Sequence, residues 1–305
     1  MSTGIKSKGL TTGTHGVEGF AGSAIQTGLL LQGIVATLPP NVGLVMIHAI
    51  NPYGFAHLRR FNEANIDLNR NFLDHSKPHP LNDGYRQLAD SIAPQSLSFW
   101  SNAKSVTKLL WFLLRHGKTE LRQAISSGQY TYSDGLFYGG VTASWSNKTI
   151  RMIASRYLSV AKKVIFIDCH TGLGDYGNAE VIMNVGEESL AYMRAKKWWG
   201  DIVKSTVAGA SVSAHLQGTL KLAFPIMLPE SEVTAVSLEF GTLPSKDVLW
   251  ALRSENWSHH WGDNRPDSKQ IKDKLLRAFY PDDKKWKLDV WQKGKKVVEQ
   301  VLSKL

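Results

Sequence analysis

The sequence has little of what marks a secreted or membrane-embedded protein. It contains one cysteine, Cys169, which excludes an internal disulfide framework and fits a reducing compartment. Its longest unbroken apolar run, residues 109–114, has six residues, far short of the roughly 20 that a membrane span needs. The first residues lack the apolar stretch of a signal peptide. We therefore expect a cytoplasmic protein that does not enter a membrane.

Internal repeats and low-complexity linkers are also absent from the sequence. Apolar residues make up 43% and charged residues 20% of the 305 residues, which excludes a disordered chain. We expect residues 1–305 to form one domain with a buried core. An irregular stretch at about 76–146 contains one helical segment, at 104–114. We interpret it as an insertion that is either purely structural or shapes a substrate site.

Positive charge is in excess and gathers near the end of the sequence. Lys and Arg number 36 against 26 Asp and Glu, a net charge of +10, and residues 269–305 hold eleven of the bases and five of the acids. Such a tail can bind nucleic acid or a membrane surface. Here the bases share a helical pattern with apolar residues, namely Trp291, Val298, Val301, Leu302 and Leu305. We predict a basic C-terminal helix at about 286–305 that packs on the domain, and we do not expect nucleic-acid binding.

Short runs rich in Val and Ile alternate with longer stretches of helical spacing. The runs at 43–50, 164–168, 179–185 and 233–240 predict buried strands. The stretches between them predict helices at about 20–35, 148–162, 187–203 and 246–254. This alternation indicates an α/β protein with a mostly parallel sheet, in which functional groups gather at the carboxyl ends of the strands. Polar clusters follow three of the strands, in NPYGF, DCHTGLG and EFGT.

A histidine and a carboxylate three residues apart form the first candidate metal site. In THGVEGF, His15 and Glu18 have the spacing H-x-x-E, which puts both side chains on one side of a helical turn, where they can bind one cation. Gly13 and Gly16 permit the tight backbone of a loop that leaves a strand. This spacing also recurs by chance, so the hypothesis needs a third ligand.

His170 is the candidate third ligand. In FIDCHTGLG, the alternation of a strand puts Asp168 and His170 on one face and Cys169 on the other. His170 would then lie at the carboxyl end of the strand. Gly172 and Gly174 would give the following loop its sharp turn. We interpret Cys169 as a small buried hydrophobe rather than a nucleophile.

Glu239, in VSLEFGT, is the candidate general base. A carboxylate that follows an apolar strand is costly to bury unless a cation or a hydrogen-bond donor meets it. Metal-assisted hydrolysis needs a base that takes a proton from water, and a Glu with a raised pKa suits that role. The alternative interpretation is a solvated Glu at the end of a strand.

The segment LRRFNEANIDLNRNF concentrates groups that bind anions. Guanidinium forks bind carboxylates or phosphates in bidentate fashion, and Asn adds neutral donors. The residues it concentrates are Arg59, Arg60, Asn62, Asp67, Asn69, Arg70 and Asn71. It lacks the spread of lysines and aromatics that a nucleic-acid surface needs. Together with two His and two Glu, the loop indicates a zinc hydrolase whose substrate has a negatively charged end.

Five motifs in this order resemble the zinc metallocarboxypeptidase superfamily: THGVEGF, NPYGF, RRFNEANIDLNRNF, DCHTGLG and SLEFGT. They most resemble an uncharacterised carboxypeptidase-like branch catalogued as a domain of unknown function. The resemblance runs from Thr14 to about Leu243 and includes FYGGVTASWSN. It implies a carboxypeptidase-like α/β fold with a mixed, mostly parallel sheet, one Zn²⁺ ion, and a small peptide or acylated amino acid with a carboxylate as substrate.

The resemblance also implies roles for the metal and its base. His15, Glu18 and His170 match the three zinc ligands, with a fourth position left for water. Glu239 matches the general base, which takes a proton from that water and gives it to the leaving amine. Asp67 resembles the acid that orients a zinc-bound imidazole, here His15.

Four further residues match substrate-binding positions. Arg60 matches the arginine that polarises the scissile carbonyl and stabilises the oxyanion, and Arg59 is its rival for that role. Asn69 and Arg70 match the pair that holds the terminal carboxylate of the substrate.

The sequence departs from the superfamily pattern in two places. Only fourteen residues precede His15, where relatives have sheet strands, so either the sheet lacks N-terminal edge strands or the chain begins inside a longer sequence. Between His170 and Glu239 the only tyrosines are Tyr176 and Tyr192, and neither has the position of the substrate-capping tyrosine of digestive carboxypeptidases.

We expect a zinc hydrolase of amide bonds next to a free carboxylate, and two alternatives stay open. One is an N-acyl amino acid deacylase that resembles the succinylglutamate desuccinylase and aspartoacylase group. The other is an inactive, shortened homologue that acts as a binding protein.

Overall fold

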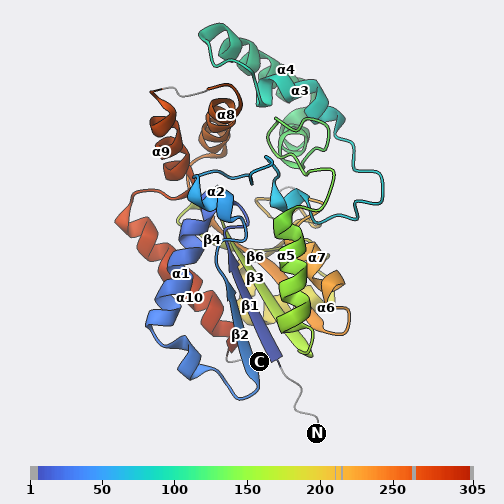
Figure 1. The fold of residues 1–305 in the computed structure, drawn as a ribbon, viewed down its shortest axis with the longest axis vertical. Coiled ribbons are helices and arrows are strands. Elements are labelled where there is room, and N and C mark those ends of the chain that lie inside the picture. The colour runs from blue at the N-terminus through green and yellow to red at the C-terminus, as the bar shows by residue number, and fades with distance from the viewer. Residues whose placement is uncertain (1–5, 210, 214–215, 263–265, 303–305) are drawn as a thin grey trace.

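A six-stranded sheet runs through the protein in the order β2-β1-β3-β6-β4-β5 (Figure 1). The computed structural model describes residues 6–209, 211–213, 216–262 and 266–302. Its strands are β1 (Lys6–Thr12), β2 (Val42–Ile47), β3 (Lys163–Tyr176), β4 (Ala179–Met183), β5 (Val203–Ser205) and β6 (Glu232–Gly241). Strand β4 is antiparallel to β6, whereas the other neighbouring pairs are parallel. The expected fold class, a mixed and mostly parallel sheet flanked by helices, is confirmed.

Helices cover both faces of this sheet and its carboxyl end (Figure 1). They are α1 (Gly19–Leu31), α2 (Pro52–Ala56), α3 (Asp83–Ile92), α4 (Phe99–Ser126), α5 (Trp145–Ile153), α6 (Leu190–Trp199), α7 (Leu220–Met227), α8 (Ser245–Trp261), α9 (Ser268–Phe279) and α10 (Lys284–Leu302). Short helical turns are η1 (Gly16–Glu18), η2 (Ile34–Thr37), η3 (Leu68–Arg70), η4 (Ala154–Leu158) and η5 (Gly200–Ile202). No helix within the described ranges combines the length and apolarity needed to cross a membrane.

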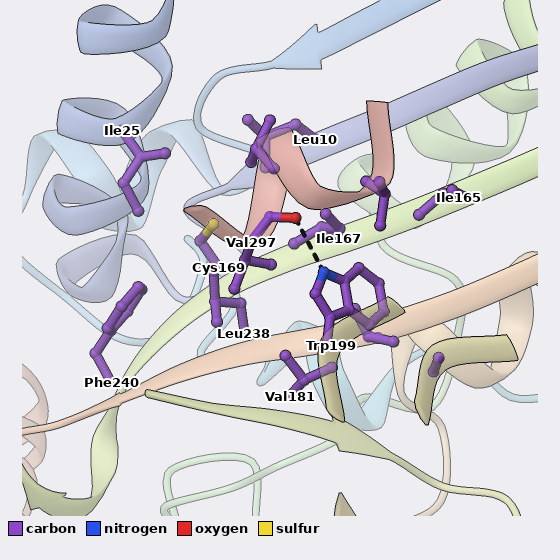
Figure 2. Packing of buried hydrophobic residues seen from close by; sticks show 14 of the residues in the cluster. Leu10, Ile25, Ile165, Ile167, Cys169, Val181, Trp199, Leu238, Phe240 and Val297 are labelled. Atoms are coloured by element: carbon purple, nitrogen blue, oxygen red, sulfur yellow. Dashed lines mark hydrogen bonds between the residues drawn. The ribbon is translucent and has the colours of Figure 1, made fainter. Parts of the chain in front are cut away.

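The alternating faces of the strands divide the core into two layers. Side chains of β3 such as Ile165, Ile167 and Cys169 pack with α1, α6 and α10. Figure 2 shows this layer, in which the Trp199 indole donates to the carbonyl of Val297 at 2.9 Å. The other face of β3 packs its apolar side chains with α5 and α7. Further along the strand, this second face carries Asp168 and His170, as the alternation predicts.

The basic C-terminal helix packs on the sheet as expected. It begins at Lys284, and its apolar side joins the first core layer through Trp286, Val290, Val297, Val298, Val301 and Leu302. Of the residues that predicted this packing, Leu305 lies outside the described residues. Because the apolar side is buried, the lysines of α10 form the side that faces solvent.

The residues before His15 supply an interior strand, which the sequence pattern did not predict. Strand β1 pairs with β2 on one side and with β3 on the other. Its sequence KSKGLTT contains one large apolar residue, Leu10, so it lacks the Val- and Ile-rich run by which the other central strands were predicted. Among the described strands, β2 and β5 form the two outer edges of the sheet.

Candidate metal centre

The loop after β1 brings His15 and Glu18 to the carboxyl end of the sheet. Gly13 turns the chain with φ +70°, a conformation that side chains disfavour. A Cβ atom on Gly16 would lie 2.0 Å from the carbonyl carbon of Gly54, so only glycine permits this approach between η1 and α2. The NPYGF segment, which contains α2, therefore supports the backbone of the THGVEG loop.

His15, Glu18 and His170 converge although 152 residues separate the last two. One potential ligand atom from each lies within 4.8 Å of the other two, and all three side chains are buried. His15 Nδ1 lies 2.9 Å from Glu18 Oε1, and His170 Nδ1 lies 2.9 Å from Glu18 Oε2. Two imidazole nitrogens and a carboxylate thus face one point, which is the donor set of a zinc site with three protein ligands.

Asp67 fixes the orientation of the His15 ring. Its Oδ1 lies 3.0 Å from His15 Nε2 and also accepts a hydrogen bond from the backbone N–H of Asn69. Arg60 Nη2 lies 3.0 Å from the same Nε2, and in the tautomer in which Nε2–H donates to Asp67 the lone pair of Nδ1 is free for a cation. This nitrogen is buried, and although Glu18 Oε1 lies 2.9 Å away, no hydrogen bond of good geometry reaches it from the described residues. The donor set and this unsatisfied nitrogen fit a bound divalent metal ion.

Asp168 holds the second imidazole in the same way. Its Oδ2 lies 2.7 Å from His170 Nε2, while its Oδ1 accepts hydrogen bonds from Thr11 at 2.9 Å and Thr14 at 2.8 Å. Both histidines therefore turn Nε2 towards an aspartate and Nδ1 towards Glu18. The sequence placed Asp168 on the face of His170, but its role appears only in the structure.

The buried charges shift the pKa values of the centre in opposite directions. Burial opposes the charge on His170, but Asp168 and Glu18 outweigh it and raise its pKa to about 10. Burial also opposes the charge on Glu18, yet His15 and Arg60 hold the pKa of this carboxyl well below its ordinary range. Without a metal, His170 therefore carries a proton that a metal ion must displace.

Glu239 lies beside His170 on the neighbouring strand. The two residues are paired in the parallel register of β3 and β6, and Glu239 accepts a hydrogen bond from the backbone N–H of Leu173 at 3.1 Å. Burial, and then the negative charge of Glu18, raise the pKa of Glu239 to about 8. The carboxylate is 7% exposed and is not solvated at the end of a strand. It thus has the raised pKa of a proton acceptor near neutral pH.

Arg60 contacts the same cluster. It donates to Glu18 Oε1 and, at 3.1 Å, to Asp67 Oδ2. Burial disfavours its charge, but these two carboxylates outweigh that effect and raise its pKa. Its side chain is 11% exposed, which makes it more open than the three metal-site residues. A permanent cation beside the cluster can stabilise negative charge that develops there.

The structure does not place Arg59 in this cluster. Its side chain is buried and turns to the other side, where it pairs with Glu255 at 2.8 Å and donates to Asn65 at 2.9 Å. Of the two adjacent arginines, Arg60 alone contacts the candidate metal ligands. Arg59 instead connects the loop to α8, which is a structural contact.

The predicted carboxylate-binding pair is engaged with the protein itself. Asn69 lies 3.2 Å from His170 Nε2 and accepts from the backbone N–H of Leu220 at 2.9 Å. The Arg70 guanidinium is buried and donates to the backbone carbonyls of Asn69 and Ser126. Asn69 therefore belongs to the site, whereas Arg70 is bound to backbone oxygens next to it.

The stretch at 76–146 contributes directly to the site. The ring of Phe137 lies 5.4 Å from the Arg60 guanidinium and 5.9 Å from that of Arg70. The backbone N–H of Asp67 donates to the carbonyl of Tyr138 at 2.7 Å. Sequence reasoning noted the FYGG motif of this stretch but named no site residue in it.

The fold and this cluster define an α/β protein with a candidate metal centre. The chain belongs to the family described as protein of unknown function (DUF2817), whose model matches residues 7–293. A comparison with curated proteins finds no match.

Several solved structures are similar to the chain at low sequence identity. Bovine thrombin-activatable fibrinolysis inhibitor, in complex with tick carboxypeptidase inhibitor, is 11% identical, with a TM-score of 0.44 over 98% of this chain and 83% of that chain. Carboxypeptidase A from Helicoverpa armigera is 13% identical, with a TM-score of 0.42 over 92% of this chain and 63% of that one. Murine aminoacylase 3 is 13% identical, with a TM-score of 0.35 over 90% of this chain and 63% of that one. The chain thus spans less than two thirds of the length of the latter two.

Proposed function

We propose that the protein is a zinc-dependent hydrolase that cleaves an amide bond next to a free carboxylate. The observation that carries this proposal is the convergence of two imidazoles and Glu18 on one point, with Glu239 on the adjacent strand. Three protein ligands leave room for a water or a substrate oxygen, as catalytic zinc sites require.

His15, Glu18 and His170 would hold the metal ion. When bound there, the ion would act as a Lewis acid that lowers the pKa of a water molecule and polarises the scissile carbonyl. Asp67 and Asp168 hold the two rings so that both Nδ1 atoms face Glu18, where they would be available to the ion.

The chain's own residues supply proton transfer and charge stabilisation. Glu239 accepts a proton from the attacking water and then donates it to the leaving amine. Its pKa of about 8 suits both steps, because neither protonation state is strongly disfavoured near neutral pH. Arg60 donates hydrogen bonds to the oxygen that becomes negative as the carbonyl is attacked.

The test is hydrolysis by the zinc-loaded protein and by its Glu239→Gln variant. The substrates are peptides with free C-termini and small N-acylated amino acids. Removal of the base should reduce kcat/KM by about 10²–10⁴-fold while zinc remains bound. Turnover of peptides alone would support a carboxypeptidase, and turnover of acylated amino acids alone would support the deacylase.

A matched control keeps the interpretation of the variant clear. Glu232→Gln changes an exposed glutamate that begins the same strand, far from the cluster, and should leave turnover unchanged. A wild-type protein that hydrolyses none of these substrates, or a Glu239→Gln variant as active as the wild type, would contradict the proposal.

A further inference from the structure

Lys221, in the first turn of α7, is a buried cation that the mechanism above does not use. Its exposed fraction is 8%. Its ammonium donates to Ser237 Oγ at 3.2 Å and to the carbonyl of Ile182 at 3.4 Å. Both acceptors are neutral, both hydrogen bonds are long, and no ion pair links this ammonium to any residue of the described ranges. A lysine is rarely buried without a counter-charge, and its third donor here has no protein acceptor in those ranges.

The sheet register places this ammonium close to the candidate metal centre. Ser237 is paired with Asp168 on one side and with Ile182 on the other. Two residues further along, on the same face, His170 is paired with Glu239. Residues two apart on a strand are about 7 Å apart. The Lys221 ammonium, which contacts Ser237, therefore lies about 7 Å along the strand from the level of His170 and Glu239.

The first turn of α7 is also tied to the centre through its backbone. The N–H of Leu220, next to Lys221, donates to Asn69 Oδ1 at 2.9 Å, and Asn69 lies beside His170. The ammonium is therefore held at a fixed place relative to the metal ligands. It is not a surface lysine that happens to lie near the site.

The arginines around the centre already have protein partners. Arg60 pairs with Glu18 and Asp67, and Arg59 pairs with Glu255. Arg70 lies 3.8 Å from Asp67 Oδ1 and donates to two backbone carbonyls. Among the described residues of the site, Lys221 is thus the cation whose charge no carboxylate meets. A ligand carboxylate would satisfy both the charge and the third donor.

We propose that Lys221 binds a carboxylate of the substrate, so that the protein selects anionic substrates. This inference rests on the proposed function and names its substrate class. The carboxylate is either the free terminal carboxylate or the side-chain carboxylate of an acidic residue. Both present the same chemistry to the ammonium, so the experiment must separate them.

The experiment is calorimetric titration of the zinc-saturated protein with three small probes. L-glutamate carries both carboxylates, L-glutamine only the terminal one, and L-isoglutamine only the side-chain one. Lys221→Met should weaken the binding of L-glutamate by about 10- to 100-fold, as expected for loss of a charged hydrogen-bond partner. Lys221→Arg, which keeps the charge, should retain binding to within a few-fold.

The two single-carboxylate probes identify the group. A loss of affinity confined to L-isoglutamine assigns Lys221 to an acidic side chain, and a loss confined to L-glutamine assigns it to the terminal carboxylate. Lys285→Met, at an exposed lysine of α10, is the matched control and should change neither. If Lys221→Met does not fold, as judged by its thermal transition, Lys221→Gln takes its place.

The inference is overturned if the wild type binds none of the probes, or if the neutral variants bind all three as the wild type does. Its failure is distinct from that of the proposed function, because the readout is binding and not turnover. If the protein hydrolyses its substrates and Lys221→Met binds the probes as the wild type does, the proposed function stands and the role of Lys221 is overturned. If Lys221→Met loses carboxylate binding in a protein without hydrolase activity, the role of Lys221 stands and the proposed function is overturned.

Discussion

At the scale of single residues, the two histidines of the candidate centre have the same arrangement. Each turns Nε2 towards a buried aspartate and Nδ1 towards Glu18. The H-x-x-E spacing and the alternation of a strand predicted which residues would be ligands. They could not show that His15 and His170 would meet, because no local rule relates residues so far apart in sequence.

Asp168 should contribute to metal affinity without contacting the metal. Asp168→Asn replaces the acceptor of His170 Nε2–H with a neutral, weaker one, which makes the imidazole a poorer ligand. We expect zinc affinity to fall about 10- to 100-fold, measured by competition with a chromophoric chelator. Asp201→Asn, at an exposed aspartate of η5, is the control. Equal affinities in the two variants would refute this role of Asp168.

The pKa of His170 predicts how pH affects the metal-free protein. Its folded-state pKa of about 10 lies above its ordinary value of 6.5, so it contributes stability that is fully present below pH 6.5 and lost as pH rises towards 10. Glu239, raised from 4.5 to about 8, acts in the same direction between those values. The free energy of unfolding of the chelator-treated protein should therefore fall from pH 6.5 to about pH 8, above which the lowered pKa of buried Lys221 acts in the opposite direction.

Zinc affinity should change in the opposite direction, because zinc and the proton compete for His170. Apparent affinity should rise with pH up to about 10, with protons released on binding. Denaturant titrations and zinc titrations across this pH range measure the two effects. Stability that increases from pH 6.5 to about pH 8 in the metal-free protein, together with zinc affinity that is independent of pH, would contradict the account.

At the scale of elements, the site depends on a close backbone approach between η1 and α2. Gly16 has no room for a Cβ atom, because the atom it would meet belongs to the Gly54 backbone. The sequence singled out the two motifs, THGVEGF and NPYGF, and predicted a Val- and Ile-rich strand only before NPYGF. It did not show that one motif supports the other, because that requires the pairing of β1 with β2.

Gly16→Ala should therefore disturb the metal centre as well as the fold. We expect a loss of about 1–3 kcal/mol in the free energy of unfolding, from overpacking against a backbone that cannot move alone. We also expect weaker zinc binding. Gly186→Ala is the control, because its Cβ would meet the end of the flexible Glu188 side chain. A Gly16→Ala variant as stable as Gly186→Ala, with unchanged zinc content, would show that the approach is unimportant.

The strands that sequence reasoning missed or ended too early share a physical reason. Strand β1 has a polar sequence, and its pairing with β2 and β3 forms it in spite of weak propensity. Strand β5 has three residues, too few for a periodic signal. Strand β3 extends to Tyr176 through a register shift after Thr171, where a turn was predicted. In each case, contacts with neighbouring strands outweigh the local pattern.

At the scale of the whole molecule, the sequence predicted the fold class and much of the site. The four Val- and Ile-rich runs became β2, β3, β4 and β6, and the polar clusters after them lie at one end of the sheet. What it could not supply was the partner of each buried charge. Sequence reasoning did not single out Lys221, and only the sheet beneath α7 shows that its ammonium is buried without an ion pair among the described residues.

Metal binding tests the central claim most directly. Zinc content should be measured by atomic emission spectroscopy, and zinc affinity by titration. Both measurements are made on the purified wild type and on three variants, His15→Ala, Glu18→Gln and His170→Ala. The account predicts one tightly bound zinc per wild-type chain and weakened or lost binding in every variant, because each removes one of three ligands. A wild type that binds no zinc, or variants that each retain one zinc with wild-type affinity, would contradict it.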